Sequence, residues 1–555
     1  MKPAPKPEPV ADVTLFLEGT YPYVLGGVSS WVDQIIKGLP ELKFSLFYIG
    51  AKHDPNAKRH YKLPDNVLTL KEVYLHQELS KREQKRRRIP AELRLALYDL
   101  LGRFYLAKTE AERMASFWAA LDALQEVETR FRFGNLLRDR EVWDILVEAY
   151  EEFFPDESFI DYFWTVRFLH LPLWNLWKAR DLVPPARVYH SVSAGYAGFI
   201  GAVTARRRHA PYFITEHGIY TKERIAEISQ ADWIYEPDRF QINFSEGLGK
   251  LKQMWINLFM FLGQVAYDQS AKIITLYSGN AATEVEFGAD PKKISIIPNG
   301  IEPTRFNAIY DQHMARWQTS PEKKYVGFIG RVVPIKDVKT LLRAARVVCE
   351  RMPEVEFLIA GPYAEDPIYF DECQKIVKLL HIEEKVHFLG MSKIMDVLPR
   401  MDVLVLTRIS EGLPLVVLEG MAAGKPNVCS DVGACRELLF GRTPPDKALG
   451  RAGRLTKIMS PAETAHALIA ILSNPETCVK MGVAARKRAE QFYGMATMLG
   501  DYRDLYNELA GKPVSRPKPT PAPVAPVVVA PAPIAAAPVQ TPAPVPSPRR
   551  PKGLP

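Results

Sequence analysis

The second half of the chain contains a series of short apolar segments, each followed by a helical pattern, and this feature most constrains the fold. The segments are Tyr325–Gly330, Val355–Gly361, Val386–Gly390 and Val403–Leu406. Strands that are apolar throughout are buried on both faces, and intervening helices make such a sheet parallel. We therefore predict a Rossmann-like, doubly wound α/β domain over residues 323–490.

The first half shows the same alternation, which predicts a second Rossmann-like domain over residues 11–298. Its strand-like runs include Asp12–Leu17, Lys43–Ile49, Arg187–Val192 and Tyr212–His217. From about 76 to 165 the residues are long, charged and helix-favouring, which predicts a helical insertion in this domain. The pattern loosens over residues 299–322, so we predict the interdomain linker there and a deep cleft between two facing domains.

The two ends of the chain differ from the rest. Residues 1–10 form a Pro-rich leader and residues 511–555 a Pro/Ala-rich tail, and both are expected to be disordered. Residues 491–510 are predicted to form a final amphipathic helix that packs back on the N-terminal domain. The tail carries six basic residues and no acids, so a net charge of +8 leaves 8 − 6 = +2 for the remainder. A nearly neutral folded part argues against a nucleic-acid partner.

Cysteine spacing and hydropathy predict a cytoplasmic protein whose membrane contact, if it has one, is peripheral to the inner membrane. The five cysteines have neither disulfide nor metal-ligand spacing. The N-terminus lacks the apolar centre of a signal peptide. The most apolar stretch, Trp255–Tyr267, is shorter than the roughly 20 residues needed to span a bilayer.

Two carboxylates stand eight positions apart where a predicted strand, 402–407, gives way to a predicted helix, 414–423. They are Glu411 and Glu419. Ligands of open α/β sheets bind in the crevice outside the carboxyl ends of the strands. The pair therefore predicts the chemical centre, although a surface loop acid and an unrelated helix acid would give the same pattern.

A loop with two cations follows the first strand of the second domain. Gly330 is followed by Arg331 and, five residues later, Lys336. A bidentate arginine and a point-charge lysine suit a diphosphate whose negative charge grows as its bond to a sugar breaks. Such a pair alone is weak evidence, but its place at the same sheet edge as the two glutamates favours a nucleotide-sugar site.

The first domain offers two further features. Gly26 and Gly27 stand between a strand and a helix, where backbone N–H groups can approach an anion. A flexible turn would equally explain a lone Gly-Gly. Two neighbouring strands end in histidine, at His190 and His217, which favours a place for these side chains in the cleft.

These motifs resemble the retaining GT-B glycosyltransferases. The resemblance rests on Gly327–Arg331 with Lys336, on Glu411–Glu419, and on Asp431-Val-Gly433 with Glu437. Within that group, Leu17–Trp31 and Thr215–Tyr220 are similar to the PelF-type enzymes of bacterial Pel exopolysaccharide synthesis. The resemblance covers approximately residues 12–509 and implies transfer of a sugar from a UDP-linked donor to a growing exopolysaccharide, with inner-membrane synthase subunits as partners.

The resemblance implies a role for each matching position. Arg331 and Lys336 would hold the donor diphosphate, Glu411 would contact the transferred sugar, Glu419 would accept hydrogen bonds from the ribose, and His217 would lie near sugar and acceptor. The other implied donor-binding residues are Gly26, Gly27, Asn299, Gly330, Gly390, Met391, Gly412 and Leu413. Many relatives have Gly-Phe-Gly where this chain has Gly412-Leu413-Pro414, a departure that bears on sugar selectivity.

No Asp-x-Asp pair occurs in the chain, so neither a metal nor a cofactor is expected, and Arg331 with Lys336 would supply the charge that a metal provides elsewhere. In this family the departing phosphate is expected to take the acceptor's proton on the same face. Two alternatives stay open. One is a nucleotide-sugar epimerase or a phosphorylase on the same fold. The other is a non-catalytic scaffold of a membrane synthase complex.

Overall fold

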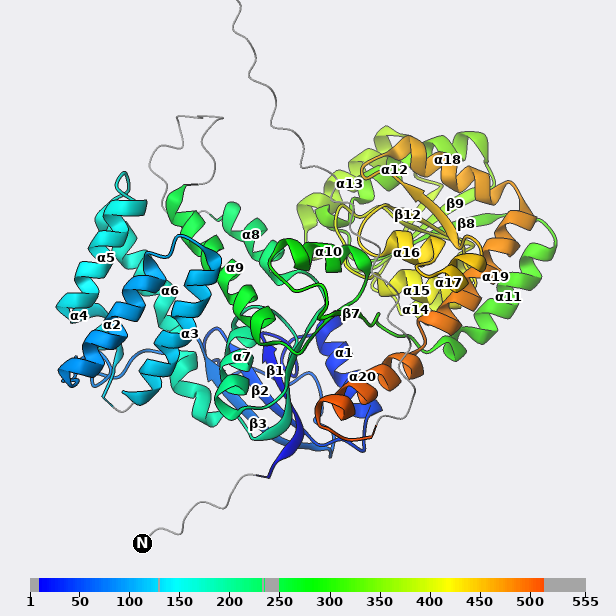
Figure 1. The fold of residues 1–555 in the computed structure, drawn as a ribbon. Coiled ribbons are helices and arrows are strands. Elements are labelled where there is room, and N and C mark those ends of the chain that lie inside the picture. Colours follow the sequence, from blue (N-terminus) through cyan, green and yellow to red (C-terminus); the bar gives the residue numbers. More distant parts are fainter. Residues whose placement is uncertain (1–8, 128–129, 232–233, 235–248, 514–555) are drawn as a thin grey trace, which may run out of the picture. The chain divides into compact units, whose positions relative to one another are not determined.

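The structure is a computed structural model of the 555-residue chain that describes residues 9–127, 130–231, 234 and 249–513. It contains two parallel sheets with the strand orders β3-β2-β1-β4-β5-β6-β7 and β10-β9-β8-β11-β12-β13 (Figure 1). The predicted class, two parallel α/β domains, is confirmed. Most of the predicted leader and tail, residues 1–8 and 514–555, lies outside the described residues.

In the first sheet, β1 lies between β2 and β4. Its strands are β1 (Ala11–Glu18), β2 (Phe44–Gly50), β3 (Val67–Tyr74), β4 (Ala186–Ser191), β5 (Tyr212–Glu216), β6 (Lys272–Thr275) and β7 (Ile294–Ile296). The helices that connect them are α1 (Gly27–Gly38), α7 (Tyr196–Arg208), α8 (Tyr220–Ser229), α9 (Lys250–Gln269) and α10 (Ser278–Glu286). Every residue of β2 is buried, as a strand covered on both faces requires. Strands β1 to β3 follow one another toward one side of the sheet, and β4 to β7 toward the other. The carboxyl ends of β1 and β4 therefore form a topological switch point.

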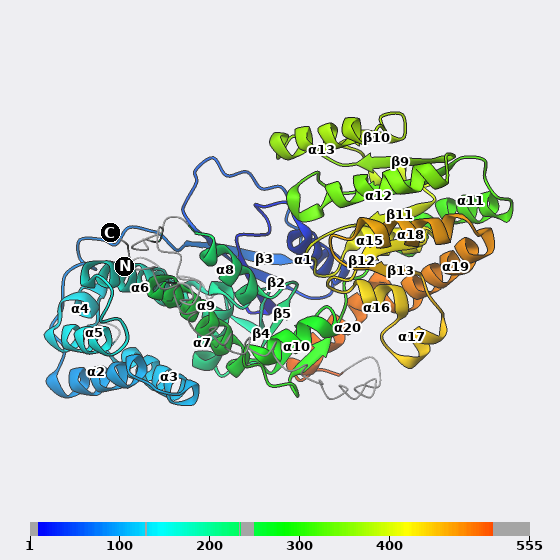
Figure 2. The same ribbon diagram turned by 90° about the horizontal axis from the view of Figure 1, so that it is seen from above.

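The helical insertion is longer than predicted. Its elements are α2 (Ala91–Tyr105), α3 (Glu110–Glu126), α4 (Phe133–Arg138), α5 (Arg140–Phe153), α6 (Phe159–Ala179) and the 3-10 turn η1 (Arg180–Leu182). The predicted end near residue 165 is wrong because α6 continues through Pro172. Packing of the last turns of α6 offsets the hydrogen bond that this proline removes. Figure 2 shows α4 and α5 on the far side of α6 from the strands.

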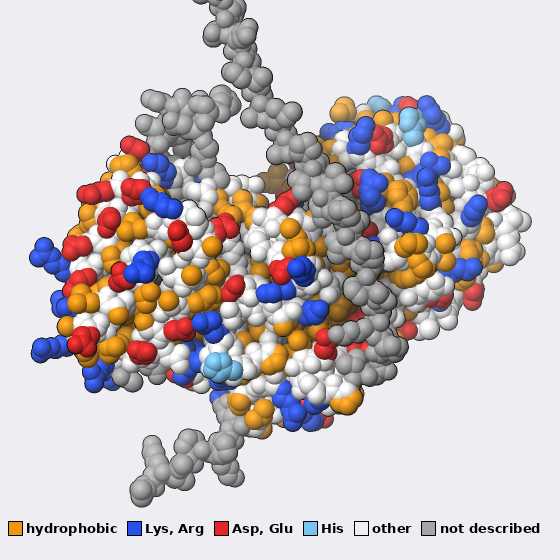
Figure 3. Space-filling view, in the orientation of Figure 1, with side chains coloured by type: hydrophobic (Ala, Val, Ile, Leu, Met, Phe, Trp, Pro, Cys, Tyr) orange, Lys and Arg blue, Asp and Glu red, His pale blue; other side chains and the backbone are white. Residues whose placement is uncertain are grey.

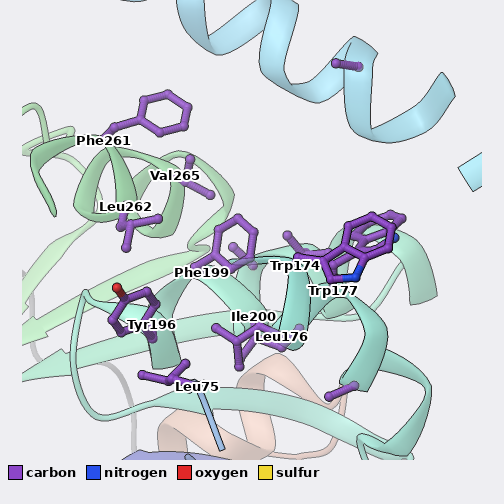
Figure 4. Packing of buried hydrophobic residues seen from close by; sticks show 14 of the residues in the cluster. Leu75, Trp174, Leu176, Trp177, Tyr196, Phe199, Ile200, Phe261, Leu262 and Val265 are labelled. Carbon is purple, nitrogen blue, oxygen red and sulfur yellow. The ribbon is translucent and has the colours of Figure 1, made fainter. Parts of the chain in front are cut away.

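Helices α6, α7 and α9 form one core beside the first sheet. Figure 4 shows Trp174, Leu176 and Trp177 of α6 near Phe199 and Ile200 of α7, and all of these side chains are buried. Each large apolar side chain buried in this way contributes roughly 1.5–3 kcal/mol. Within the described part of the chain, no helix has both the length and the apolar character needed to cross a lipid bilayer.

The second sheet is built from six short strands. They are β8 (Lys324–Ile329), β9 (Val355–Ala360), β10 (Val386–Gly390), β11 (Val403–Leu406), β12 (Asn427–Ser430) and β13 (Gly453–Thr456). Its helices are η3 (Pro334–Lys336), α12 (Val338–Arg351), α13 (Pro367–Leu379), α14 (Ile394–Val397), η4 (Leu398–Arg400), α15 (Leu415–Ala422), α16 (Cys435–Phe440), α17 (Pro444–Ala448), α18 (Pro461–Leu472) and α19 (Pro475–Phe492). Every residue of β11 is buried, so both faces of the sheet are covered. On the face seen in Figure 3, positive and negative side chains are intermixed.

The stretch predicted as a loose linker, residues 299–322, contains ordered helices. These are η2 (Pro303–Phe306) and α11 (Asn307–Gln318). Ile309, His313 and Trp317 recur every four residues and are buried, which explains why this segment is a packed helix. The Trp317 indole N–H donates to Asp402 at 2.8 Å and fixes α11 beside β11.

The last helix belongs to the first domain by packing, although it follows the second in sequence. Helix α20 (Met495–Leu509) is separated from α19 by Tyr493 and Gly494. Tyr502 and Tyr506 share a buried cluster with β-strand residues of the first sheet, among them Val13, Val188 and Phe213. His190 binds the Tyr506 hydroxyl at 2.9 Å and the Thr215 hydroxyl at 3.0 Å. The cleft position expected for His190 is therefore wrong, because α20 covers it and makes it a core residue.

Candidate active site

The carboxyl ends of β8, β9 and β10 form one continuous edge. Gly330 donates its N–H to Ala360 O at 2.9 Å, and Gly361 donates to Gly390 O at 2.8 Å. Gly361 has a φ of +148°, and a Cβ there would lie 2.0 Å from Gly330 O, so only glycine fits. The structure thus brings the predicted Gly330 and Gly390 to the same edge.

An aromatic side chain that the sequence analysis missed lies beside Gly390. Tyr363 is stacked on Phe370, with ring centroids 4.2 Å apart and planes 10° apart. A Cβ built at Gly390 would lie 3.6 Å from the Tyr363 ring, and the neighbouring Met391 is 80% exposed. This edge therefore offers an aromatic face and accessible backbone. Tyr363 could have been found as the aromatic residue that follows Gly361 at a strand end.

Three cations gather at the ends of β8 and β11. Burial, followed by the charges of Arg408 and Arg331, lowers the pKa of Lys336 to about 7. Burial, followed by the charge of Arg331, lowers the pKa of Arg408 to about 10. Arg408 follows β11 and precedes Glu411 by three residues. It was not among the predicted site residues, although the strand-end rule that located Glu411 applies to it equally. Cations this close repel one another, so the cluster suits an anionic ligand.

Arg331 lies at the exposed side of this cluster. Its guanidinium forms an ion pair with Glu365, and the two side chains are 50% and 49% exposed. Exposed pairs of this kind contribute about 0–1 kcal/mol. An anion that enters the site can therefore draw Arg331 away from Glu365 at little cost.

The two glutamates have different surroundings. Glu411 forms an ion pair with Arg408, the side chains being 15% and 16% exposed, and its Oε1 accepts the Gly412 N–H at 3.3 Å. Glu419 lies in the second turn of α15, where burial raises its pKa to about 7 although Arg305 acts in the opposite direction. The predicted helix start needs a small correction, since Pro414 is the N-cap and the helix begins at Leu415.

His217 follows β5 and meets the Glu411 loop. Burial lowers the pKa of His217 to about 4, and its Nε2 is buried without a hydrogen-bond partner among the described residues. A Cβ built at Gly412 would lie 3.0 Å from His217 O, so the two loops touch. The free nitrogen of a neutral imidazole can donate or accept one hydrogen bond with a ligand, depending on the tautomer. The neutral ring supplies no positive charge at neutral pH.

Other predicted positions show weaker signs of a ligand site. A Cβ built at Gly26 or Gly27 would meet no atom within 4 Å. The space beside both residues is therefore open, and no close contact requires glycine at either position. The Asn299 side-chain oxygen is buried without a hydrogen-bond partner among the described residues. A ligand group that donates a hydrogen bond would satisfy it. Leu413 is buried in the second-domain core, which makes it a support for its loop.

A cavity of about 870 Å³ opens in the first domain at the carboxyl ends of β1, β4 and β5. His217, Tyr220 and Glu18 line it. Glu18 accepts hydrogen bonds from the Tyr220 hydroxyl at 2.6 Å and from Ala197 N at 3.1 Å, and burial raises its pKa. Glu18 was not among the predicted site residues, although it ends β1 at the switch point where such a residue is expected.

The loops of the two domains also meet at Glu437, which belongs to the sequence motif noted above. Its carboxylate accepts the Ser278 N–H at the start of α10, at 2.8 Å. Among the described residues, no group of three or more His, Cys, Asp or Glu side chains could hold a metal ion. Independence from metal stays a prediction.

Two family models match the chain. Residues 11–292 match the family described as "Domain of unknown function (DUF3492)", and residues 310–488 match "Glycosyl transferases group 1". Among curated proteins, the D-inositol 3-phosphate glycosyltransferase of Streptomyces scabiei is 29% identical over 37% of this chain and 47% of its own length. That of Nocardia farcinica is 25% identical over 53% of this chain and 61% of its own length. The chain spans about half the length of the curated relatives it matches.

Solved structures share the fold across most of the chain. Anabaena HepE in complex with UDP has a TM-score of 0.53 and 14% identity, over 89% of this chain and 99% of its own. Sucrose-phosphate synthase from Thermosynechococcus elongatus has a TM-score of 0.53 and 15% identity, over 90% of this chain and 99% of its own. At such low identity the likeness is one of fold alone.

Proposed function

The chain belongs to the DUF3492 family, and because its residues 310–488 belong to the group 1 glycosyl transferases, we propose that it transfers a sugar from a UDP-linked donor to a growing exopolysaccharide. The observation that carries this proposal is the cluster of Arg331, Lys336 and Arg408. The charges of Arg331 and Arg408 add to the effect of burial in lowering the pKa of Lys336, and a bound diphosphate would offset this repulsion.

The chemistry proposed is retaining and independent of metal. The bond from the sugar's anomeric carbon to the β-phosphate oxygen breaks, and a bond from that carbon to the acceptor oxygen forms on the same face. The acceptor's proton passes to the departing phosphate. Lys336 and the two arginines stabilise the charge that grows on this phosphate, so electrostatics and positioning supply most of the rate.

The remaining groups hold the donor. Glu411, kept in place by Arg408, contacts the transferred sugar, and Glu419 accepts hydrogen bonds from the ribose. Gly390, Met391 and the nearby Tyr363 receive the base, and His217 exchanges a hydrogen bond with the sugar or the acceptor. The presence of UDP in a structure of the same fold supports uridine as the base.

The acceptor is proposed from the chain's own residues. Leu17–Trp31 and Thr215–Tyr220 resemble PelF-type enzymes and support a Pel-like exopolysaccharide, extended at the cytoplasmic side of a membrane synthase. The relatives named for D-inositol 3-phosphate make a phosphorylated polyol the second candidate acceptor. Product analysis with radiolabelled UDP-sugar distinguishes these acceptors and separates transfer from epimerisation or phosphorolysis.

Calorimetric titration with UDP, GDP and ADP tests the donor. We expect UDP to bind most tightly. Glu419→Gln should weaken UDP binding about tenfold or more, because it replaces a carboxylate hydrogen-bond acceptor with an amide. Glu411→Gln should leave UDP binding unchanged but slow transfer, because this residue is assigned to the sugar. Glu350→Gln, which alters an exposed helix pair with Arg346, is the control. Absence of binding by all three nucleotides would refute the proposal, since a scaffold needs no nucleotide.

UDP binding should also depend on pH through Lys336. The ammonium form holds the diphosphate, and the pKa of Lys336 in the free protein is about 7. Above pH 7 binding must therefore take up a proton, and affinity should fall as pH rises from 7 to 9, by at most about tenfold per unit. Calorimetry in two buffers of different ionisation enthalpy measures this uptake. It should vanish in Lys336→Met and persist in Lys339→Met. An affinity that stays constant over this range would contradict the assignment.

A further inference from the structure

We propose that the first-domain cavity continues onto helix α6 as a glycan-binding track, in which Phe168 and Trp164 stack on successive sugar rings of an oligosaccharide acceptor. This inference rests on the proposed function and specifies its acceptor as a chain of sugars. It also gives the helical insertion a role in substrate binding.

The track begins inside the cavity. Phe168 of α6 lines the cavity together with Trp255 and Phe259 of α9, while His217 lies on its wall and touches the Gly412 loop. The cavity's volume of about 870 Å³ is in the upper part of the range of small-molecule sites. It is therefore large enough for more than one sugar ring next to the proposed reaction centre.

Outside the cavity the aromatic surface continues along one face of α6. Ile160, Trp164 and Phe168 are spaced four residues apart and are 67%, 45% and 52% exposed. The ring centroids of Trp164 and Phe168 lie 6.0 Å apart with planes 30° apart, and the Arg167 guanidinium lies 5.3 Å from the Trp164 centroid, so a sugar would use the face of Trp164 that Arg167 leaves open. Four residues of helix rise about 6 Å, close to the length of one sugar unit in an extended glycan.

The opposite face of α6 supplies the packing that holds the helix in place. Val166 and Leu169 are buried, so Trp164 and Phe168 are not needed to anchor it. Soluble proteins seldom expose a row of large apolar side chains without a binding role.

The chemistry of the cavity favours a sugar over a lipid chain. Besides its apolar residues, the wall carries polar side chains from the end of β1 and from α8, namely Glu18, Tyr220 and Glu223. A sugar ring has an apolar C–H face for the aromatic rings and hydroxyl groups for the polar side chains. A lipid chain would offer no hydrogen-bonding group to this polar side of the cavity, whereas the hydroxyl groups of a sugar would.

Direct binding without any nucleotide tests the track. Maltose-series and chitin-series oligosaccharides of one to six units would be titrated into the full chain by calorimetry. We expect affinity for at least one series to rise with length and then level off. Trp164→Ala and Phe168→Ala should each weaken binding of the longer oligomers about three- to tenfold, in line with one lost aromatic contact, whereas Trp164→Phe should restore it. Trp143→Ala, at an exposed tryptophan of α5 outside the cavity, should bind as the wild type does.

Several outcomes would overturn the track. They are no oligosaccharide binding in either series, affinity independent of length, or unchanged binding by both alanine variants with wild-type melting temperatures. Cosedimentation with anionic phosphatidylglycerol vesicles that is lost in both variants, without oligosaccharide binding, would assign the stripe to a membrane surface instead. Because UDP is absent, a failure here is distinct from a failure of the donor assignment.

Discussion

Lys336→Ala is expected to slow sugar transfer by about 10²–10³-fold, the usual cost of removing one group that stabilises charge in a transition state. Lys336 ends the turn η3, and its amine is close enough to Arg331 and Arg408 for their charges to lower its pKa. Its interaction with the departing phosphate grows as the sugar–phosphate bond breaks, so kcat should fall as much as kcat/KM. Initial rates with radiolabelled UDP-sugar measure both.

Lys339→Ala is the matched control for this substitution. Lys339 lies three residues further along the chain in α12, paired with the exposed Glu372 at 2.6 Å and away from the cation cluster. Its removal should change the rate by less than about twofold, because surface pairs contribute little. A Lys336→Ala enzyme that matches the wild-type rate would remove the cation cluster from the mechanism.

Tyr502→Ala is expected to lower the free energy of unfolding by about 3–5 kcal/mol, the range measured for large buried aromatic side chains. Tyr502 is fully buried between α20 and the first sheet, hydrogen-bonded to Thr215 at 3.1 Å and in edge contact with Trp31 at 5.1 Å. Its loss leaves a cavity and removes one of the two hydrogen-bond partners of the Thr215 hydroxyl, the other being His190. Denaturant unfolding followed by circular dichroism measures the change.

The neighbouring residue provides the comparison. Arg503 lies on the same helix but is exposed and paired with Glu41, so Arg503→Ala should cost less than about 1 kcal/mol. If Tyr502→Ala were as stable as Arg503→Ala, the packing of α20 on the first sheet would not be a source of stability.

The fold was largely predictable because its strands are apolar throughout. Runs such as Val403–Leu406 appear in the sequence as continuous hydrophobic segments, and helices between them leave a parallel sheet as the simple solution. Boundaries were harder to predict. Pro172 suggests a helix end but lies within α6, and α11 was mistaken for a linker because its buried face has only three widely spaced residues.

Site residues were predictable where the side chain lies at a strand end. They were not predictable where the packing partners of a side chain are distant in the sequence. His190 and His217 have similar sequence contexts, but His190 points into the sheet's covered face and meets Tyr506, 316 residues later. Only tertiary structure reveals that covering helix. Arg408 and Glu18, in contrast, carry the same strand-end signal as Glu411, and attention to charge at every strand end would have found them.

The return of α20 to the first sheet has a consequence for biosynthesis. Ribosomes add about 5–20 residues per second, so roughly 10–40 s separate the end of β7 at Ile296 from the start of α20 at Met495. During that interval the nascent chain exposes the apolar surface of the first sheet that α20 later covers, including Val13 and Val188. The second domain is synthesised in full before the first is complete. A ribosome that stalls within α19 would therefore release a chain with an open hydrophobic sheet, a natural substrate for chaperones and proteases.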